Sequence, residues 1–204
     1  KLKKVISYLF EENGYHGSRQ DYYNRANSYM NRVLDDREGL PITLSVLVME
    51  LAAACGIDDV AGVGAPGHFI VRHLHGDTEQ FIDPFDSGHY MTRGEAENMV
   101  RANTGRSLMP DDLATSTDLE IVLRMIRNLM GAVPENSSST ELLRYTETVV
   151  ALQPESAFDR WSRAVLLIQN RQYDPAKKDL EWLLKTKPIG VDLERVLQLY
   201  QTLQ

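Results

Sequence analysis

The most constraining feature of this sequence is an almost wholly apolar run from residue 42 to residue 55. Only three of its residues are clearly polar: Thr43, Ser45 and Glu50. Pro41 precedes the run, at a position where the first turn of a helix tolerates a residue without an N–H group. Gly56 follows it, as glycine commonly does just beyond a helix. Because a helix that is apolar on all sides must be covered on all sides, the run predicts a central, buried helix.

The pattern after this helix changes to the alternation that is typical of strands. Residues 60–63 form a short apolar run, and residues 68–74 alternate well enough for a strand. A hairpin-type turn at 75–77 leads to a return strand at 80–83, which Pro84 closes. A helix-rich start followed by a small antiparallel sheet predicts an α+β fold.

The second half of the chain is predicted to be helical throughout. A mostly polar segment with glycine, proline and several threonines precedes it, and we place a linker there, at residues 106–118. The predicted domains are therefore residues 1–105 and residues 119–204. Apolar periodicity predicts helices at 119–130, 142–152, 158–170, 175–185 and 193–203.

The helical half contains a repeat signal. Pro154 and Pro188 close similar segments and lie 34 residues apart, which is the tetratricopeptide period. Ala164, Tyr173 and Ala176 also occupy positions that match this repeat. The preceding unit matches poorly. A tetratricopeptide-like region and a generic helical bundle are both open, and we favour the first.

The chain is acidic, with 22 Lys and Arg against 29 Asp and Glu and a formal net charge of -7. Since no Lys- or Arg-rich run interrupts this balance, we expect no nucleic-acid partner. No stretch approaches the roughly 18 apolar residues of a membrane span, so we expect no membrane partner either. The first residue is not Met, and we expect the chain to be part of a longer protein.

Cys55 is the only cysteine in the chain. It has no partner for an internal disulfide and no second thiol for a C-x-x-C zinc site, which fits a reducing, cytoplasmic location. His73 and His75 fall on one face of a strand and His68 falls on the other, so we expect solvated histidines and no metal site. We expect no other cofactor.

One constellation in the first domain is capable of chemistry. His68 begins one predicted strand and Asp83 ends its neighbour, so their side chains can lie next to each other. A carboxylate that accepts from one imidazole nitrogen fixes the tautomer and raises the basicity of the other nitrogen. A helix N-terminus nearby would lower the pKa of a thiol placed there. Helix start, histidine and aspartate, in that order, form the layout of a papain-like thiol site.

These segments resemble a known family. The sequences His-Phe-Ile-Val at 68–71 and Ile-Asp-Pro at 82–84 are similar, in motif and in separation, to the histidine and aspartate motifs of the transglutaminase-like superfamily. Further segments resemble its SirB-type bacterial branch: 27–31, 37–45, 66–69, 83–85 and 123–129. That resemblance covers most of the chain and implies a transglutaminase-like core joined to a tetratricopeptide-like tail.

The chain departs from this family at the nucleophile. In active members of the superfamily, the catalytic cysteine follows a glycine by two positions and opens the buried helix. Here Gly39-Leu40-Pro41 occupies that place, and proline has no nucleophilic group. Cys55 lies at the other end of the helix, roughly 20 Å away at the rise of an α-helix. Its apolar neighbours disfavour a thiolate, so we expect Cys55 to be a structural core residue.

A hydroxyl group is an alternative nucleophile. Ser45 and Thr43 are the candidates, and Ser45 lies one turn beyond Pro41 on about the same helix face. A buried serine in a helix more often bonds the carbonyl four residues earlier. His68 and Asp83 are therefore a structural pair, a ligand-binding pair or a residual acid–base site.

Other polar residues are candidates for binding. Asn27, Ser28 and Asn31 form a polar cluster upstream of the buried helix, and either cap a short helix or line the His68 pocket. His89 resembles a loop position near the mouth of the site, with an open role.

Two functions follow from these residues. The first is a non-catalytic binding, scaffold or regulatory protein, whose helical half binds a protein or peptide. The second is an amide or ester hydrolase that uses His68 and Asp83 with Ser45, Thr43 or an activated water. A general base alone supplies about 10²–10⁴-fold acceleration, less than most enzymes achieve, which favours the first function. The residues indicate neither the partner's identity nor an oligomeric state.

Overall fold

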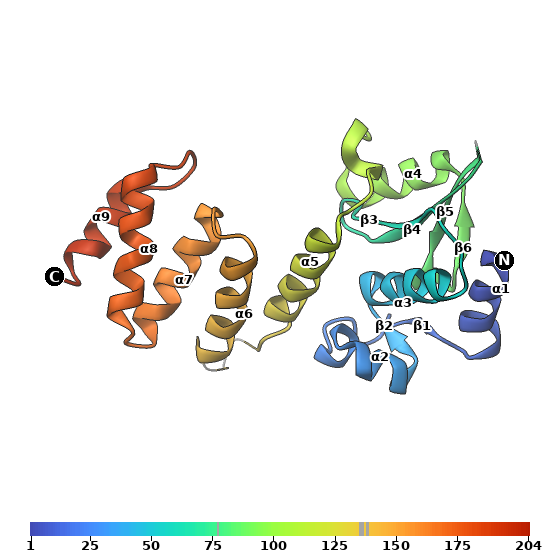
Figure 1. Cartoon of the computed structure of the whole chain (residues 1–204), viewed down its shortest axis with the longest axis horizontal. Coiled ribbons are helices and arrows are strands. Elements are labelled where there is room, and N and C mark those ends of the chain that lie inside the picture. Colours follow the sequence, from blue (N-terminus) through green and yellow to red (C-terminus); the bar gives the residue numbers. More distant parts are fainter. Residues whose placement is uncertain (77, 135–136, 138) are drawn as a thin grey trace. The chain divides into compact units, whose positions relative to one another are not determined.

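A computed structural model describes residues 1–76, 78–134, 137 and 139–204 of the 204-residue chain. Within these ranges the chain forms two compact units, Lys1–Asn128 and Leu129–Gln204. The first unit contains helices and a small antiparallel sheet, and the second is helical (Figure 1). The α+β fold class predicted from the sequence is confirmed.

The apolar run forms helix α3, Pro41–Ala54, with Pro41 in its first turn and Gly56 in the left-handed region just beyond it, at φ 61°. Its N-terminal half is buried, as predicted, but Ala53 and Ala54 at its C-terminal end are exposed to solvent, although Ala52 before them is fully buried. Cys55 caps this end and is exposed. The expectation that Cys55 is a core residue is therefore wrong. The alanines before it made the segment read as core, although residues this small are common on surfaces as well as in interiors.

The sheet of the first unit has four antiparallel strands in the order β3-β4-β5-β6. Their bounds are β3 Val60–Val63, β4 Ile70–His75, β5 Thr78–Asp83 and β6 His89–Met91. The predicted hairpin is β4 and β5, with Val71 opposite Ile82, and Asp77 in its predicted turn lies outside the described residues. Strand β6 was not predicted, because three residues are too few to show an alternating pattern.

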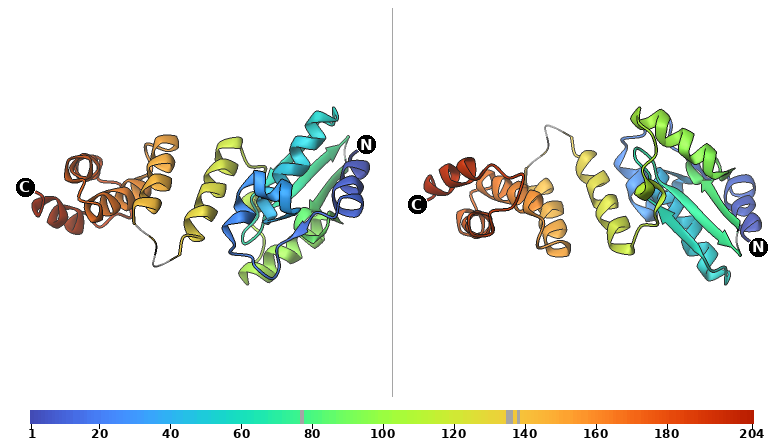
Figure 2. Two further views of the ribbon diagram at one scale, coloured as in Figure 1. Left: turned by 90° about the horizontal axis from the view of Figure 1, so that it is seen from below. Right: turned by 90° about the horizontal axis from the view of Figure 1, so that it is seen from above.

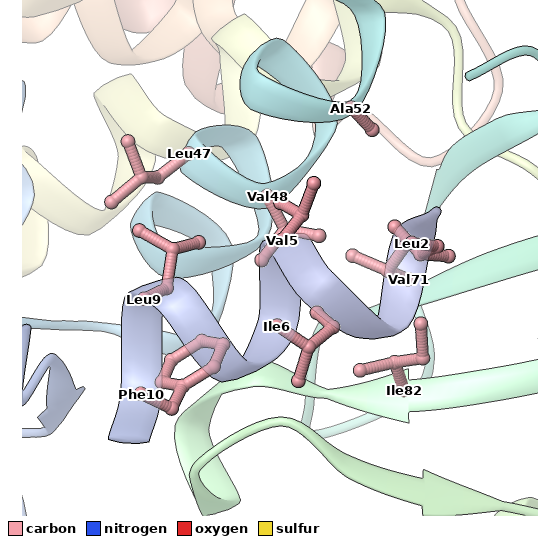
Figure 3. Close-up of a cluster of buried hydrophobic side chains, with 10 residues drawn as sticks. All are labelled: Leu2, Val5, Ile6, Leu9, Phe10, Leu47, Val48, Ala52, Val71 and Ile82. Carbon is pink, nitrogen blue, oxygen red and sulfur yellow. The ribbon is translucent and has the colours of Figure 1, made fainter. Parts of the chain in front are cut away.

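Alternate side chains of the central strands enter two different cores. Val71 and Ile82 pack on one face against α3 and the N-terminal helix α1, Leu2–Ile6 (Figure 3). Ile70 and Phe81 point to the other face and pack against α4, Arg93–Thr104. Figure 2 shows the sheet between α3 and α4. Each such buried side chain contributes about 1.5–3 kcal/mol, so the two cores together fix the register of the hairpin.

The segment before α3 is built from short helices and strands. Helix α1 continues into a π-helical turn, and short elements follow: η1 Ser7–Glu12, β1 His16–Gly17, η2 Arg25–Ser28, α2 Met30–Asp36 and β2 Glu38–Gly39. Strands β1 and β2 pair in parallel. One interpretation of the sequence made Asn27 and Ser28 caps of a short helix, and this interpretation is wrong. Asn24 caps η2 by accepting from the Ala26 N–H at 3.0 Å, and α2 begins after Tyr29.

Residues 106–118, predicted as a linker, pack against the first unit. They contain the short helix η4, Pro110–Leu113, whose Leu113 is buried under the sheet. The Ser116 N–H donates to the Gly62 carbonyl at 2.8 Å. Helix α5, Asp118–Gly131, also begins in this unit. The division between the units follows Asn128, later than the predicted boundary, because these contacts anchor the segment to the sheet.

The second unit consists of helices that pack on their neighbours in the chain. They are α6 Ser139–Leu152, α7 Ala157–Gln169, α8 Tyr173–Thr186 and α9 Leu193–Gln201. Its core includes Ala164 and Leu180, both fully buried. The carboxylate of Asp179, on α8, is also buried and binds Arg160 and Arg163 of α7 at 2.7–2.9 Å. In the ranges that the structure describes, no helix has the length and apolar character needed to cross a bilayer.

Candidate functional site

His68 and Asp83 form a hydrogen-bonded pair in the first unit. His68 lies in the loop just before β4, Asp83 ends β5, and Nε2 of the imidazole is 2.9 Å from Oδ2 of the carboxylate. Both side chains are mostly buried, at 14% and 13% exposure. An ionised carboxylate only accepts, so Nε2 carries the proton. In the neutral ring, Nδ1 is then an acceptor.

Asp83 is itself held in place by the backbone that follows it. Its Oδ1 accepts from the N–H groups of Phe85 and Asp86 at 3.0 and 3.3 Å. These bonds cap the short helix η3, Pro84–Asp86. The ring of Phe85 meets the His68 ring edge-on, with centroids 6.0 Å apart. The orientation of the imidazole is therefore fixed from two sides.

A small polar pocket lies beside His68. It has a volume of about 40 Å³ and is lined by Tyr22, Pro41, Ile42, Gly67, His68, Phe69, Arg124 and Asn128. It thus brings together the start of α3 and the histidine, as the sequence predicted. One water molecule needs a cavity of roughly 10–15 Å³ when the volume is that open to the centre of the molecule. The pocket therefore has room for about three non-hydrogen atoms. No Cys, Ser or Thr is among the described residues that line it.

The two candidate hydroxyls are committed elsewhere. Ser45 Oγ donates to the Pro41 carbonyl at 2.7 Å, the bond to the fourth residue before it that a buried helical serine favours. Thr43 Oγ1 accepts from the Leu40 N–H at 2.9 Å and donates to the Asn27 carbonyl at 2.9 Å. Both side chains are buried, and neither lines the pocket. In this conformation neither hydroxyl is placed to attack a bound substrate.

The remaining predicted residues lie outside the pocket. Asn27 is buried and donates to the Asp21 carbonyl at 2.7 Å, which fixes the preceding loop. Ser28 is also buried, whereas Asn31 is exposed on α2. His89 is exposed as well; it lies in β6 opposite Asp83, not in a loop. The structure does not join these side chains to the His68 pocket.

Arg124 is a site residue that the sequence reasoning did not single out. Its Nη2 donates to the carbonyls of His68 and Ala65 at 2.8 and 3.3 Å, and its guanidinium lies 5.4 Å from the Phe69 ring centroid. Burial lowers the pKa of Arg124, and the neighbouring Tyr22 opposes this. The 123–129 segment of the family resemblance contains this arginine. The predicted domain boundary placed Arg124 in the helical domain, so the sequence provided no reason to expect it beside His68.

His73 and His75 lie away from the pair. Their rings stack 5.9 Å apart, and burial lowers the pKa of His73, with His75 adding to the effect. They border a groove of about 780 Å³ that contains neither His68 nor Asp83. Among the residues described, no three His, Cys, Asp or Glu side chains are placed to hold a metal ion. The His68 pocket is far below the roughly 300 Å³ of a typical cofactor site.

The start of a buried helix, a histidine before one strand and an aspartate at the end of the next lie together here. This is the arrangement that the resemblance to the transglutaminase-like superfamily implies, with Pro41 at the start of the helix. Comparison with known proteins agrees: the family model described as "Transglutaminase-like superfamily" matches residues 1–127. The chain belongs to the transglutaminase-like superfamily.

Several curated proteins are similar to the chain. A UPF0162 protein of Xylella fastidiosa (strain 9a5c) is 32% identical over 202 residues, which cover 96% of this chain and 71% of the relative. A UPF0162 protein of Haemophilus influenzae is 25% identical, covering 92% and 70%. F-box only protein 21 of Mus musculus is 29% identical over 83% of this chain and 27% of its own length. No solved structure matches the chain.

Proposed function

We propose that this protein is a non-catalytic, SirB-type member of the superfamily that acts as a binding or scaffold module. The observation that carries the proposal is Pro41 at the nucleophile position, directly beside the His68 pocket. The hydroxyls of Thr43 and Ser45, the candidates on α3, are buried and bonded to backbone groups. The exposed thiol of Cys55 is at the far end of the same helix. A covalent acyl intermediate therefore has no cysteine, serine or threonine on which to form among the described residues that line the pocket.

The proposed partner is a protein or peptide, bound with a contribution from the helical unit. Its tetratricopeptide-like character is supported by the 34-residue spacing and by Ala164 and Ala176, which are fully buried in the helix packing. Phe158 and Ile189 border a groove of about 350 Å³ there and are largely exposed. The occurrence of similar regions in relatives of different lengths supports a transferable module. The acidic charge argues against nucleic acid, and one exposed thiol fits the cytoplasm.

Activity-based probes test the absence of turnover. We would treat the full chain, in a Cys55→Ser background, with a fluorophosphonate and with an iodoacetamide probe. The expected result is no labelling that depends on His68, judged against His68→Gln. Fluorophosphonate labelling that disappears in Ser45→Ala or Thr43→Val would overturn the proposal, because it would identify a working nucleophile.

Substitutions on the helical unit test its role in partner binding. The full chain with Phe158→Ser and Ile189→Ser would be compared with Tyr8→Ser, which changes an exposed aromatic residue of the first unit. We expect the double variant to lose the partner proteins that the wild type captures, and Tyr8→Ser to retain them. Equal capture of partners by the wild type, the double variant and Tyr8→Ser would contradict a role for the helical unit.

A second candidate function rests on the intact His68–Asp83 pair. The pair leaves Nδ1 as an acceptor beside a pocket that admits water, which is the arrangement of a general base. The corresponding activity is hydrolysis of an amide or ester by an activated water. It predicts slow turnover of an activated ester that His68→Gln lowers by about 10²-fold or more. Rates that are equal for wild type and His68→Gln would exclude it.

A further inference from the structure

Arg124 is a partly buried cation without a carboxylate partner in the described part of the chain. Its hydrogen bonds go from Nη2 to two backbone carbonyls, at Ala65 and His68. Other partly buried arginines behave differently: Arg160 and Arg163 both bind the buried carboxylate of Asp179, and Arg72 lies 3.8 Å from the carboxylate of Glu79. Since charges taken out of water are normally paired, Arg124 has the electrostatics of an unfilled anion site.

The His68 pocket, onto which Arg124 opens, has matching chemistry. Its lining residues include Arg124, His68, Tyr22 and Asn128, but no acidic residue among those described. The carboxylate of Asp83, which is bonded to His68, does not serve as this anion. It already accepts from His68 and from two backbone N–H groups. The pocket therefore has lining residues that carry donor groups, Arg124, Tyr22 and Asn128, and no anion of its own among the described residues.

The size of the pocket restricts what it admits. A volume of about 40 Å³ holds about three non-hydrogen atoms, which is the size of a carboxylate group. A drug-sized ligand needs roughly 300 Å³ or more. A group this small that must also carry a negative charge fits as the tip of a longer molecule.

The surface next to the pocket suits a polypeptide. Tyr22 packs edge-on against Tyr23 and Phe85, with centroids 5.3 and 5.9 Å apart, and Arg19 lies over the Phe85 ring at 5.2 Å. Tyr23 is 79% exposed. Tyrosine and arginine are enriched among the residues that dominate protein interfaces, because they bury large areas and also form hydrogen bonds.

We propose that the His68 pocket receives the carboxylate of an acidic side chain from a partner polypeptide, with Arg124 as its counter-ion. The inference rests on the proposed function, since it assigns the vacant nucleophile site to non-covalent recognition. The tyrosine surface contacts the neighbouring residues of the partner. No covalent step is involved. The carboxylate accepts from Arg124 and not from His68, because Nε2 of the neutral ring already donates to Asp83 and Nδ1 is an acceptor.

Nitrogen-15 NMR on the full chain tests the proposal with three probes: acetyl-Ala-Glu-Ala-amide, acetyl-Ala-Gln-Ala-amide and acetate. The readouts are the ring nitrogens of His68 and Nε of Arg124. We expect the Glu peptide to shift both signals to saturation and to bind about 10-fold more tightly than the Gln peptide, as a charge-assisted hydrogen bond implies. Equal affinity of the two peptides would overturn the assignment of a carboxylate as the bound group. Acetate that binds as tightly as the Glu peptide would overturn the assignment of a polypeptide as the partner.

Variants identify the counter-ion. Arg124→Gln is expected to abolish the preference for Glu over Gln, and Arg124→Lys to keep at least part of it. The matched control is Arg101→Gln, which removes an exposed arginine of α4 and should leave the preference unchanged. A folded Arg124→Gln protein that still prefers Glu would overturn the proposal. If Arg124→Gln does not fold, saturating Glu peptide that leaves the Arg124 Nε signal of the wild type unshifted would do so.

The carboxylate site and the non-catalytic function can fail separately. Absence of a Glu preference, with no probe labelling, removes the carboxylate site and leaves the non-catalytic binding module standing. Mass spectrometry that detects cleavage or covalent capture of the Glu or Gln peptide would contradict the proposed non-catalytic function itself.

Discussion

Asp83 accepts from the imidazole of His68 with one carboxylate oxygen, at 2.9 Å, and from backbone N–H groups with the other, at 3.0 and 3.3 Å. One carboxylate thus fixes a ring and caps a helical turn. These two roles can be separated by substitution, because an amide can replace only one of them.

Asp83→Asn should change the tautomer of His68. The amide oxygen can still accept from the backbone N–H of Phe85, while the NH₂ group faces Nε2 and donates to it. We expect the neutral ring to move its proton to Nδ1, as measured by the nitrogen-15 shifts of the imidazole, at a cost of about 1–3 kcal/mol in unfolding free energy. Asp86→Asn is the control, since its carboxylate binds the exposed Arg19. An unchanged tautomer in Asp83→Asn would show that the carboxylate does not set it.

Thr43→Val should destabilise the protein much more than Ser45→Ala. The Thr43 hydroxyl accepts from the Leu40 N–H and donates to the Asn27 carbonyl, so its removal leaves both backbone groups without this partner. Each group left unpaired should lower the free energy of unfolding by about 1–3 kcal/mol. Ser45 only adds a bond to a helical carbonyl, so its loss should cost about 1 kcal/mol or less. Urea unfolding measures both, and Thr43→Ser should keep most of the stability. Equal losses would contradict the assigned hydrogen bonds.

Asp179→Ala should be among the most damaging substitutions in the helical unit. It leaves Arg160 and Arg163 without the carboxylate that both bind, and breaking a buried pair costs about 3–5 kcal/mol. The same helix offers a control in Asp174→Ala, which changes an exposed residue and should cost under about 0.5 kcal/mol. Chemical denaturation followed by circular dichroism gives both values. A loss below about 1 kcal/mol at Asp179 would mean that the arginines find water instead.

Asp112 should make stability depend on pH in the acid range. Hydrogen bonds from Arg106 and from the Met109 N–H lower its pKa to about 2, from an ordinary value of 3.8. The folded state therefore holds the proton more weakly than the unfolded state. The stabilisation is complete above the unfolded pKa and is lost as the pH falls from 3.8 to about 2.

The variant Asp112→Asn tests this dependence. Its melting temperature should lie below that of the wild type at pH 6, and the two should converge at pH 2. Asp111→Asn, at the neighbouring exposed position, should follow the wild type throughout. A difference between Asp112→Asn and the wild type that stays constant with pH would refute the assignment.

Cys55 should react in the folded protein. Because its side chain is exposed at the end of α3, a thiol reagent such as dithionitrobenzoate is expected to modify one cysteine per chain without denaturant. The rate should approach that of a small thiol at the same pH. Modification that requires urea would restore the core assignment made from its apolar neighbours.

The sequence was most informative where a pattern was long or a residue had a single structural use. Pro41 and Gly56 bounded α3, since proline fits the first helical turn and glycine the left-handed residue beyond the last. The hairpin was also predictable, and with it the approach of His68 to Asp83. Both depend on local periodicity, which the order of residues carries directly.

The sequence was least informative where a contact joins distant segments. Arg124 reaches the carbonyl of His68 across 56 residues, and no local pattern marks such a bond. Exposure at a helix end is likewise set by what packs there, so Cys55 read as a core residue. The parallel pairing of β1 with β2 involves two residues on each strand, too few to leave a period.

The double engagement of Asp83 bears on how such a protein changes during evolution. A carboxylate with a single partner can be exchanged at the cost of that partner alone. Replacing Asp83 would also uncap η3 at the end of β5, so folding constrains this position independently of any chemistry at His68.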